Sequence, residues 1–470
     1  MTIDYPTEFR RRVLGPRLNV RSGVYTAIDP ALTMRLTERG EYEYSGLDDG
    51  YTGPFDDLLK VSAFGGAAAT EEQFASRAYP ASEGAAAHPI IGHYRGLFAG
   101  HVVEGQYRAN GSSGGVATWM LVELLRTRRV DGVIHLVPTR SGGTLFEYRI
   151  SRTVDDVREG AKSRYYPGQL GDVLTEIATA GERFALTAIP SFAYEVRLLQ
   201  DLKPGFRAAI PYVIGLVCGH QKSANYAQYL AWRAGIDPAQ VDYVDFRRKV
   251  EGRPANKYTT EFRSTEHGQP VVRAFPQEEI LGTDWGLGFF KTNFSDFTED
   301  IFNETADIVL GDAWLPRYTS DSAGTNIVIT RHAELHELIE SARDAGRLHL
   351  EDQTESEIMR SQSSLVRHNV DELPMRFSYL AAAGGYTPTP RRGARTEVPR
   401  LRRRIQILRY WIAQRSNEAW PRAWAAGDLS LFDAEVLPLV RRYQRVQRAM
   451  NSNVSPRRII SRLLRALRAG

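Results

Sequence analysis

The chain has 470 residues, 42% of them hydrophobic and 25% charged, which is typical of a folded protein with two or three domains. It contains a single cysteine, Cys218, which excludes an internal disulfide and any zinc or iron–sulfur site built on several thiolates of this chain. The net charge of +4 is unevenly distributed, because residues 391–470 hold nineteen arginines and five acids (+14), which leaves −10 for residues 1–390.

The first 90 residues are rich in turn-forming residues and show no long helical periodicity. Alternating apolar residues over 88–108 then predict β-structure, which ends at the glycine-serine loop "GSSGG", residues 111–115. Apolar residues at helical spacing follow over 116–130, and 131–138 has the pattern of the next strand. This order of strand, glycine loop, helix and strand predicts an α/β layer.

The same alternation continues along the chain. We expect helices over 168–181, 192–202, 224–235 and 332–346, and strands over 183–190, 208–219, 241–250, 257–264, 304–316 and 324–331. The two segments 241–250 and 257–264 are expected to pair. Residues 385–400 form a linker rich in proline and arginine, and helical segments follow it.

These pieces, read in order, resemble the beta subunit family of coenzyme F420 hydrogenase/dehydrogenase. The resemblance covers about residues 15–350 and rests on an ordered set of motifs. They are "GHYRGLFAG", "RANGSSGGVATWMLVELL", "AKSRYYP", "TAIPSFAYEVRLL", "IGLVCGHQKS", "ADIVLGDAW" and "GTNIVITR". It implies a mixed-sheet, flavin-binding α/β core over 91–385, a small ferredoxin-like remnant over 1–90 and a basic helical tail over 386–470.

Such proteins bind FAD, carry iron–sulfur clusters and pass electrons to a second partner, which in some members is the deazaflavin coenzyme F420. The family's cysteines are replaced in this chain. They fall on Asn19, Ser22, Tyr25 and Asp29, near Ser62, on Ser191 and within "KTNFSDF", residues 291–297. Because serine, asparagine, tyrosine and aspartate do not replace thiolates around an iron–sulfur cluster, we expect a cluster-free relative.

Two segments are candidates for flavin contact. Glycines in "GSSGG" allow close backbone approach, and the following helix directs its positive end at the loop, so Ser112, Ser113, Gly114 and Gly115 suit a pyrophosphate or the flavin edge. In "AKSRYYP", Lys162 and Arg164 suit phosphate oxygens and Tyr165 suits an aromatic ring. The alternatives are a plain strand–helix turn and a solvated basic turn.

Two further segments follow predicted strands, where ligands collect in α/β sheets. In "CGHQKS", His220 and Lys222 are candidate catalytic residues for proton transfer or anion binding, whereas Cys218 alone is more typical of packing. Asp312 in "GDAW" is a candidate cofactor ligand, through a ribose hydroxyl, or else a turn-capping residue. Asp296, Glu299 and Asp300 match no standard metal loop, so we expect a solvated acidic turn and no metal site.

The predicted function is therefore FAD-dependent hydride transfer to or from a small-molecule or glycan-type substrate, without iron–sulfur clusters, with F420 or NAD(P)H as partner. Family association suggests polysaccharide biosynthesis. The alternative is a non-redox scaffold or a sugar-modifying transferase.

No apolar run is long enough to span a bilayer, and no secretory signal is present at the N-terminus, so we expect a cytoplasmic protein. The last segment, residues 455–470, predicts a helix with an apolar stripe and an arginine stripe. Such a helix suits peripheral contact with an anionic membrane or docking on the body of the protein. Nucleic acid is not expected as a partner, because no recognised binding motif is present.

Overall fold

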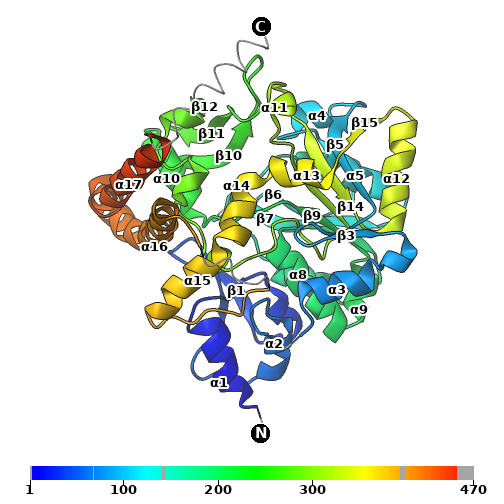
Figure 1. The fold of residues 1–470 in the computed structure, drawn as a ribbon, viewed down its shortest axis with the longest axis horizontal. Helices are drawn as coiled ribbons and strands as arrows, with labels where there is room; N and C mark the ends of the chain where they lie inside the picture. The colour runs from blue at the N-terminus through cyan, green and yellow to red at the C-terminus, as the bar shows by residue number, and fades with distance from the viewer. Residues whose placement is uncertain (1–2, 67, 140–142, 392–396, 453–470) are drawn as a thin grey trace.

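The computed structural model describes residues 3–66, 68–139, 143–391 and 397–452 (Figure 1). Within the described part of the first 90 residues, the longest helix has eight residues, which confirms the predicted lack of a long helix. The elements here are α1 (Tyr5–Phe9), a π-helical turn (Arg10–Leu14), a 3-10 turn (Val24–Ala27), β1 (Thr33–Leu36), β2 (Tyr42–Ser45), α2 (Phe55–Val61), α3 (Glu71–Ala78), β3 (Ala86–His88) and β4 (Gly92–Tyr94). β1 pairs with β2, and β3 with β4, as antiparallel hairpins.

The core is an eight-stranded mixed sheet in the order β15-β5-β14-β13-β9-β8-β6-β7. Its strands are β5 (Gly96–Val102), β6 (Gly132–Pro138), β7 (Phe146–Ser151), β8 (Phe184–Ala188), β9 (Tyr212–Leu216), β13 (Ile308–Asp312), β14 (Asn326–Thr330) and β15 (Leu348–Asp352). The neighbours β6, β8, β9 and β13 run parallel, and β14, β15 and β7 run antiparallel to their neighbours. The α/β prediction is confirmed.

Helices cover both faces of this sheet. Each central strand therefore alternates between two apolar clusters, for example Val213 toward one face and Ile214 toward the other. One face packs on α5 (Val116–Arg126), α6 (Val154–Glu159) and α12 (Ala333–Asp344). The other packs on α7 (Gly171–Ile177) and α8 (Pro190–Leu202). Burial on both faces explains the nearly continuous apolar runs in these strands.

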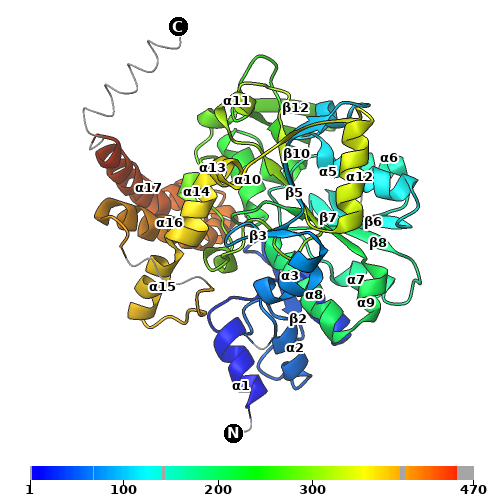
Figure 2. The same ribbon diagram turned by 45° about the vertical axis from the view of Figure 1, so that its right-hand side comes forward.

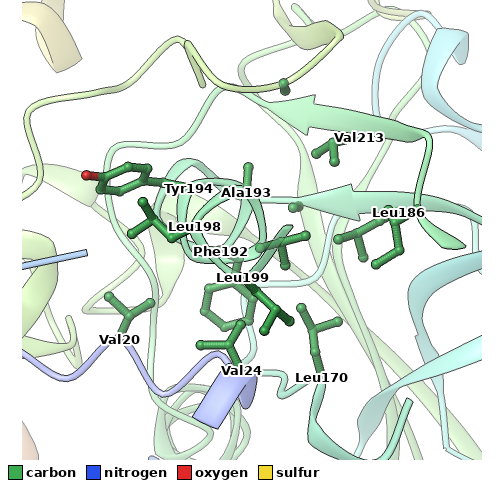
Figure 3. Packing of buried hydrophobic residues seen from close by; sticks show 14 of the residues in the cluster. Val20, Val24, Leu170, Leu186, Phe192, Ala193, Tyr194, Leu198, Leu199 and Val213 are labelled. Atoms are coloured by element: carbon green, nitrogen blue, oxygen red, sulfur yellow. The ribbon is translucent and has the colours of Figure 1, made fainter. Parts of the chain in front are cut away.

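The N-terminal segment packs against the second of these faces. Figure 3 shows Phe192 and Leu199 of α8 beside Val24 of the N-terminal segment, with Leu186 of β8 and Val213 of β9 in the same cluster. The cluster continues through Phe9 and Leu58, so α1 and α2 pack on the sheet through α8. Pro190 begins α8 at the first helical position, where its missing N–H leaves no hydrogen bond unmade.

A second apolar core lies beside the main sheet. It joins the three-stranded antiparallel sheet of β10 (Val241–Arg248), β11 (Thr259–Glu266) and β12 (Gln269–Pro276) to α10 (Asn225–Arg233), α16 (Arg400–Ala426) and α17 (Leu429–Ser452). β10 and β11 form the predicted pair. α16 and α17 form an antiparallel hairpin, and Gly427, with φ of 63°, provides the left-handed residue that ends α16.

The remaining helices connect these layers. They are α4 (Tyr107–Asn110), α9 (Gly205–Ala209), α11 (Pro316–Thr319), α13 (Glu355–Ser361), α14 (Ser363–Val366) and α15 (Leu373–Ala382). Figure 2 shows α16 and α17 side by side at the margin of the molecule, far from α12. The predicted helix over 455–470 lies outside the described residues, and none of the described helices is long and apolar enough to cross a membrane.

Candidate functional site

The three predicted loops meet at one edge of the main sheet. β9 and β13 are parallel, so their carboxyl ends at Leu216 and Asp312 lie together, and the ladder through β14 places the end of β5 on the same edge. The "GSSGG" loop follows β5 through α4, "CGHQKS" follows β9, and "GDAW" includes the end of β13. The sheet therefore brings together segments that are up to 200 residues apart in sequence.

The glycines of the "GSSGG" loop are required by contacts within the protein. A Cβ on Gly114 would lie 2.6 Å from the carbonyl oxygen of Gly100, and Gly115 has a φ of 83°. The Ser113 hydroxyl donates to the carbonyl of Thr325 at 2.9 Å, and the Ser112 hydroxyl accepts from the Ser163 N–H at 2.8 Å. The loop is thus fixed between the start of β14 and the "AKSRYYP" segment.

Arg164 in "AKSRYYP" lies over two aromatic rings, 4.8 Å from the centroid of Phe146 and 5.2 Å from that of Tyr243. Its Nη2 donates to the carbonyl of Ala161, but within the described residues its buried Nε and Nη1 have no hydrogen-bond partner. Burial lowers the pKa of this guanidinium. Two orphaned donors on a planar cation match an oxygen-rich anion.

Lys162 adopts a φ of 96°, which is unusual for a residue with a side chain. Its ammonium lies 3.1 Å from the carboxylate of Asp245 on β10. Asp245 is almost fully buried. Tyr165 lies deeper, with its ring 4.6 Å from Trp285 and 5.4 Å from Phe246. This short segment therefore supplies two cations, Lys162 and Arg164, and the aromatic face of Tyr165.

Two residues at the site were not predicted from the sequence: Arg247, near the end of β10, and Lys249, just after it. Arg247 forms a bidentate pair with Asp312, at 2.6 and 2.9 Å, and lies over the rings of Tyr258 and Trp314. The Lys249 ammonium donates to the carbonyls of Arg108 and Ser113. The basic run "FRRKV" at the end of this strand is the sequence feature that could have indicated them. A local pattern does not show, however, that this end of the strand lies against the "GSSGG" loop.

Positive charge is in excess here. Burial and the neighbouring charges of Lys162, Arg108 and Arg247 lower the pKa of Lys249 to about 7. Asp312, predicted as a cofactor ligand, is held by Arg247 at both carboxylate oxygens. An anion beside these cations would restore the charged form of Lys249, because it would oppose the same repulsion that lowers the pKa.

The "CGHQKS" loop forms the inner part of the site. His220 lies 4.4 Å from the Trp285 ring, and within the described residues its buried Nε2 has no partner. The Lys222 ammonium donates to the carbonyl of Phe289 at 2.6 Å and lies over the rings of Trp285 and Tyr226. Burial, together with nearby cations, lowers the pKa of both His220 and Lys222 well below their usual values. Both shifts favour the neutral, proton-accepting form of the side chain.

Cys218 differs from these neighbours. Its thiol donates to the carbonyl of His220 at 3.5 Å, and burial raises its pKa to about 11. Because the thiolate is the reactive form, a protonated thiol of this kind suits packing rather than nucleophilic chemistry.

Three of the positions where the resemblance places the family's cysteines, Ser22, Tyr25 and Ser62, lie in a buried hydrogen-bond network. The Ser22 hydroxyl donates to Glu195 at 2.5 Å, the Ala63 N–H donates to the other carboxylate oxygen at 3.1 Å, and Tyr25 and Ser62 share a 2.6 Å hydrogen bond. Among the described residues, no group of three or more histidine, cysteine, aspartate or glutamate side chains is placed to hold a metal ion.

The prediction of a solvated acidic turn at 293–300 is wrong. Asp296 and Asp300 are only 2% and 3% exposed, and Glu299 is 8% exposed. Asp296 pairs with the buried Lys291, and Arg391 binds Glu299 through its backbone N–H. Asp296 is compensated by Lys291, five residues before it, and by Arg376 at 3.8 Å, whose distance in the sequence hides this contact from local spacing.

Two family models match the sequence. Residues 97–175 match the model for the N-terminal part of coenzyme F420 hydrogenase/dehydrogenase beta subunits, and residues 181–356 match the model for their C-terminal part. Among solved structures, a chain of the F420-reducing [NiFe] hydrogenase complex from Methanosarcina barkeri is similar. It shares 17% identity and a TM-score of 0.46 over 63% of this chain and 96% of that chain. No curated protein matches the sequence.

Proposed function

Because the chain belongs to the coenzyme F420 hydrogenase/dehydrogenase beta subunit family, which comprises oxidoreductase subunits, we propose that it is an FAD-dependent oxidoreductase working without iron–sulfur clusters. The flavin would lie at the carboxyl edge of the main sheet, against "GSSGG", "AKSRYYP" and "CGHQKS". The two orphaned N–H donors of Arg164, beside a loop fixed by Ser112, carry the proposal.

The outer part of the site fits a pyrophosphate. Lys162, Arg164 and Lys249 supply cations around the "GSSGG" loop, and Asp245 pairs with Lys162. Guanidinium and ammonium groups on fixed backbone suit phosphate oxygens, whose charge would compensate the cations that lower the pKa of Lys249. Ser112 and Ser113 position this loop through their hydroxyls rather than presenting free donors.

The inner part fits a planar ring. Tyr165, Trp285 and His220 form a continuous aromatic wall, with Tyr165 and His220 each within 4.6 Å of the Trp285 ring centroid. When bound, FAD would supply two-electron hydride chemistry at this wall. His220 would hold or take a proton at its unpartnered Nε2, and Lys222 would orient the same end of the site from its hydrogen bond to Phe289.

The residues do not fit an iron–sulfur cluster. Ser22, Tyr25 and Ser62 replace thiolates and use their hydroxyls in hydrogen bonds with one another or with Glu195. We therefore assign no electron relay through a cluster to this chain. Two electrons and a proton would instead pass directly between the flavin site, an organic or glycan-type substrate, and F420 or NAD(P)H.

Fluorescence titration of the full chain with FAD tests this assignment. Arg164→Gln removes the orphaned donors and is expected to raise the Kd for FAD at least about tenfold, the equivalent of one lost charge-assisted hydrogen bond. The matched control is Arg263→Gln, because Arg263 also lies over Tyr243, at 4.8 Å, but is exposed and paired with Glu261. The control is expected to bind as the wild type does.

Two outcomes contradict the proposal. Equal Kd values for the two variants would remove Arg164 from the site, and a wild type that never binds FAD would favour the scaffold or transferase alternative. Circular dichroism of both variants, together with Arg164→Lys, which keeps the charge, separates loss of binding from loss of folding.

A further inference from the structure

A groove of about 500 Å³ lies between α16 and α17. Figure 2 shows this helical hairpin at the margin of the molecule. The groove is lined by side chains of both helices: Arg404, Ile407, Leu408, Trp411, Leu439, Arg442, Arg445 and Val446. The apolar residues recur at three- and four-residue spacing and form its floor, and three arginines stand around it. No acidic side chain is among these lining residues.

The three arginines lack anionic partners. Within the described part of the chain, Arg404 and Arg442 form no hydrogen bond or ion pair through their side chains, and Arg445 only donates to the carbonyl of Arg441 at 3.4 Å. By contrast, Arg402 and Arg422 on the same hairpin pair with Glu372 and Glu435. The groove thus holds three arginines of the hairpin whose charge no carboxylate of the described residues compensates.

The floor of the groove is partly open to solvent. Trp411 is 40% exposed, and its indole N–H donates to the hydroxyl of Tyr379 at 3.0 Å. A partly exposed tryptophan whose polar edge is hydrogen-bonded is typical of residues at a lipid–water interface. Leu408, three residues before it on α16, is 8% exposed.

We propose that this groove binds the headgroup and upper hydrocarbon of an anionic phospholipid in a bilayer surface. The arginines would contact the phosphate, and Trp411 would contact the hydrocarbon. The volume is that of a small-molecule site, not of a standard protein interface. α16 and α17 together carry eleven arginines and three acids, so the whole hairpin is attracted to an anionic surface. Residues 453–470 hold five arginines and no acid, so repulsion by the arginines of the groove would oppose binding of this segment there.

This inference is independent of the flavin proposal. The test is co-sedimentation of the full chain with vesicles of phosphatidylcholine alone or mixed with phosphatidylglycerol. The groove variant is Arg404→Gln/Arg442→Gln/Arg445→Gln. The control, Arg403→Gln/Arg441→Gln/Arg448→Gln, removes the same charge from exposed arginines of the same helices that do not line the groove.

Both triple variants lose the same surface charge, so we expect the groove variant to bind the anionic vesicles at least about tenfold more weakly than the control. Brominated lipid should quench wild-type fluorescence more than that of Trp411→Phe. Equal loss in both triple variants would mean diffuse surface attraction, and no loss in either would place binding elsewhere; both overturn the proposal. Thermal stabilisation by inorganic phosphate in the absence of lipid, lost only in the groove variant, would show a soluble-anion site and also overturn it.

Discussion

Glu195 is a buried carboxyl that, within the described part of the chain, accepts hydrogen bonds from the Ser22 hydroxyl and the Ala63 N–H. Burial raises the pKa of Glu195 to about 7. Burial also raises the pKa of Glu71 to about 7, although the nearby charge of Arg391 opposes this shift. The folded state therefore binds protons more tightly than the unfolded chain, in which a glutamate titrates near 4.5. Its contribution to stability is complete below pH 4.5 and is lost as the pH rises through 7.

Glu195→Gln tests this linkage. Glutamine resembles the protonated carboxyl, so the variant should become more stable relative to the wild type between pH 5 and pH 8, by at most about 3 kcal/mol in the free energy of unfolding. Glu71 titrates in both proteins and cancels from the difference. Urea unfolding at the two pH values gives the quantity directly. A difference between variant and wild type that does not change with pH would show that Glu195 ionises normally in the folded state.

Residue types at the candidate site could be predicted, but their pairing could not. Tyr165, His220 and Lys222 each contact the Trp285 ring, and Lys162 pairs with Asp245, although none of these partners is near them in the sequence. The glycines of "GSSGG" were attributed to ligand approach, yet Gly114 and Gly115 already meet backbone atoms of Gly100 and Tyr107. Local sequence contains no information on contacts between strands distant in the chain.

At the scale of elements, α16 is part of the folded body. Trp420 is 1% exposed and contacts the rings of Tyr229 on α10, Phe290, and Phe432 on α17. The apolar spacing predicted helices after residue 400. It could not show that these helices pack on α10 and on the segment around Phe290. The many arginines after residue 390 suggested a separate basic tail. The packing of α16 depends instead on its buried apolar face, which includes Trp420.

Trp420→Ala should destabilise the protein by about 3–5 kcal/mol, the range for removing a fully buried aromatic side chain. Trp424→Ala on the same helix is the control, because Trp424 is 38% exposed and should cost less than half as much. Guanidinium unfolding followed by circular dichroism measures both. Equal losses in the two variants would mean that α16 is not anchored through Trp420.

At the scale of the whole molecule, the mixed sheet determines where chemistry can occur. Strand order could not be derived from periodicity, because buried strands look alike, and only the ordered motifs of the family suggested which loops meet. The sheet gathers the ends of β5, β9 and β13 at one edge, and β10 places Asp245, Arg247 and Lys249 against them. The result is a cation-rich, aromatic-walled site, while the aligned cysteine positions are filled by hydrogen-bonded side chains.

The most direct test is the absorbance spectrum of the full chain after incubation with FAD and removal of unbound flavin by gel filtration. The account predicts a yellow protein with one FAD per chain and only flavin bands. A colourless protein would contradict the flavin site, and a brown protein with the broad absorption of an iron–sulfur cluster would contradict the cluster-free assignment.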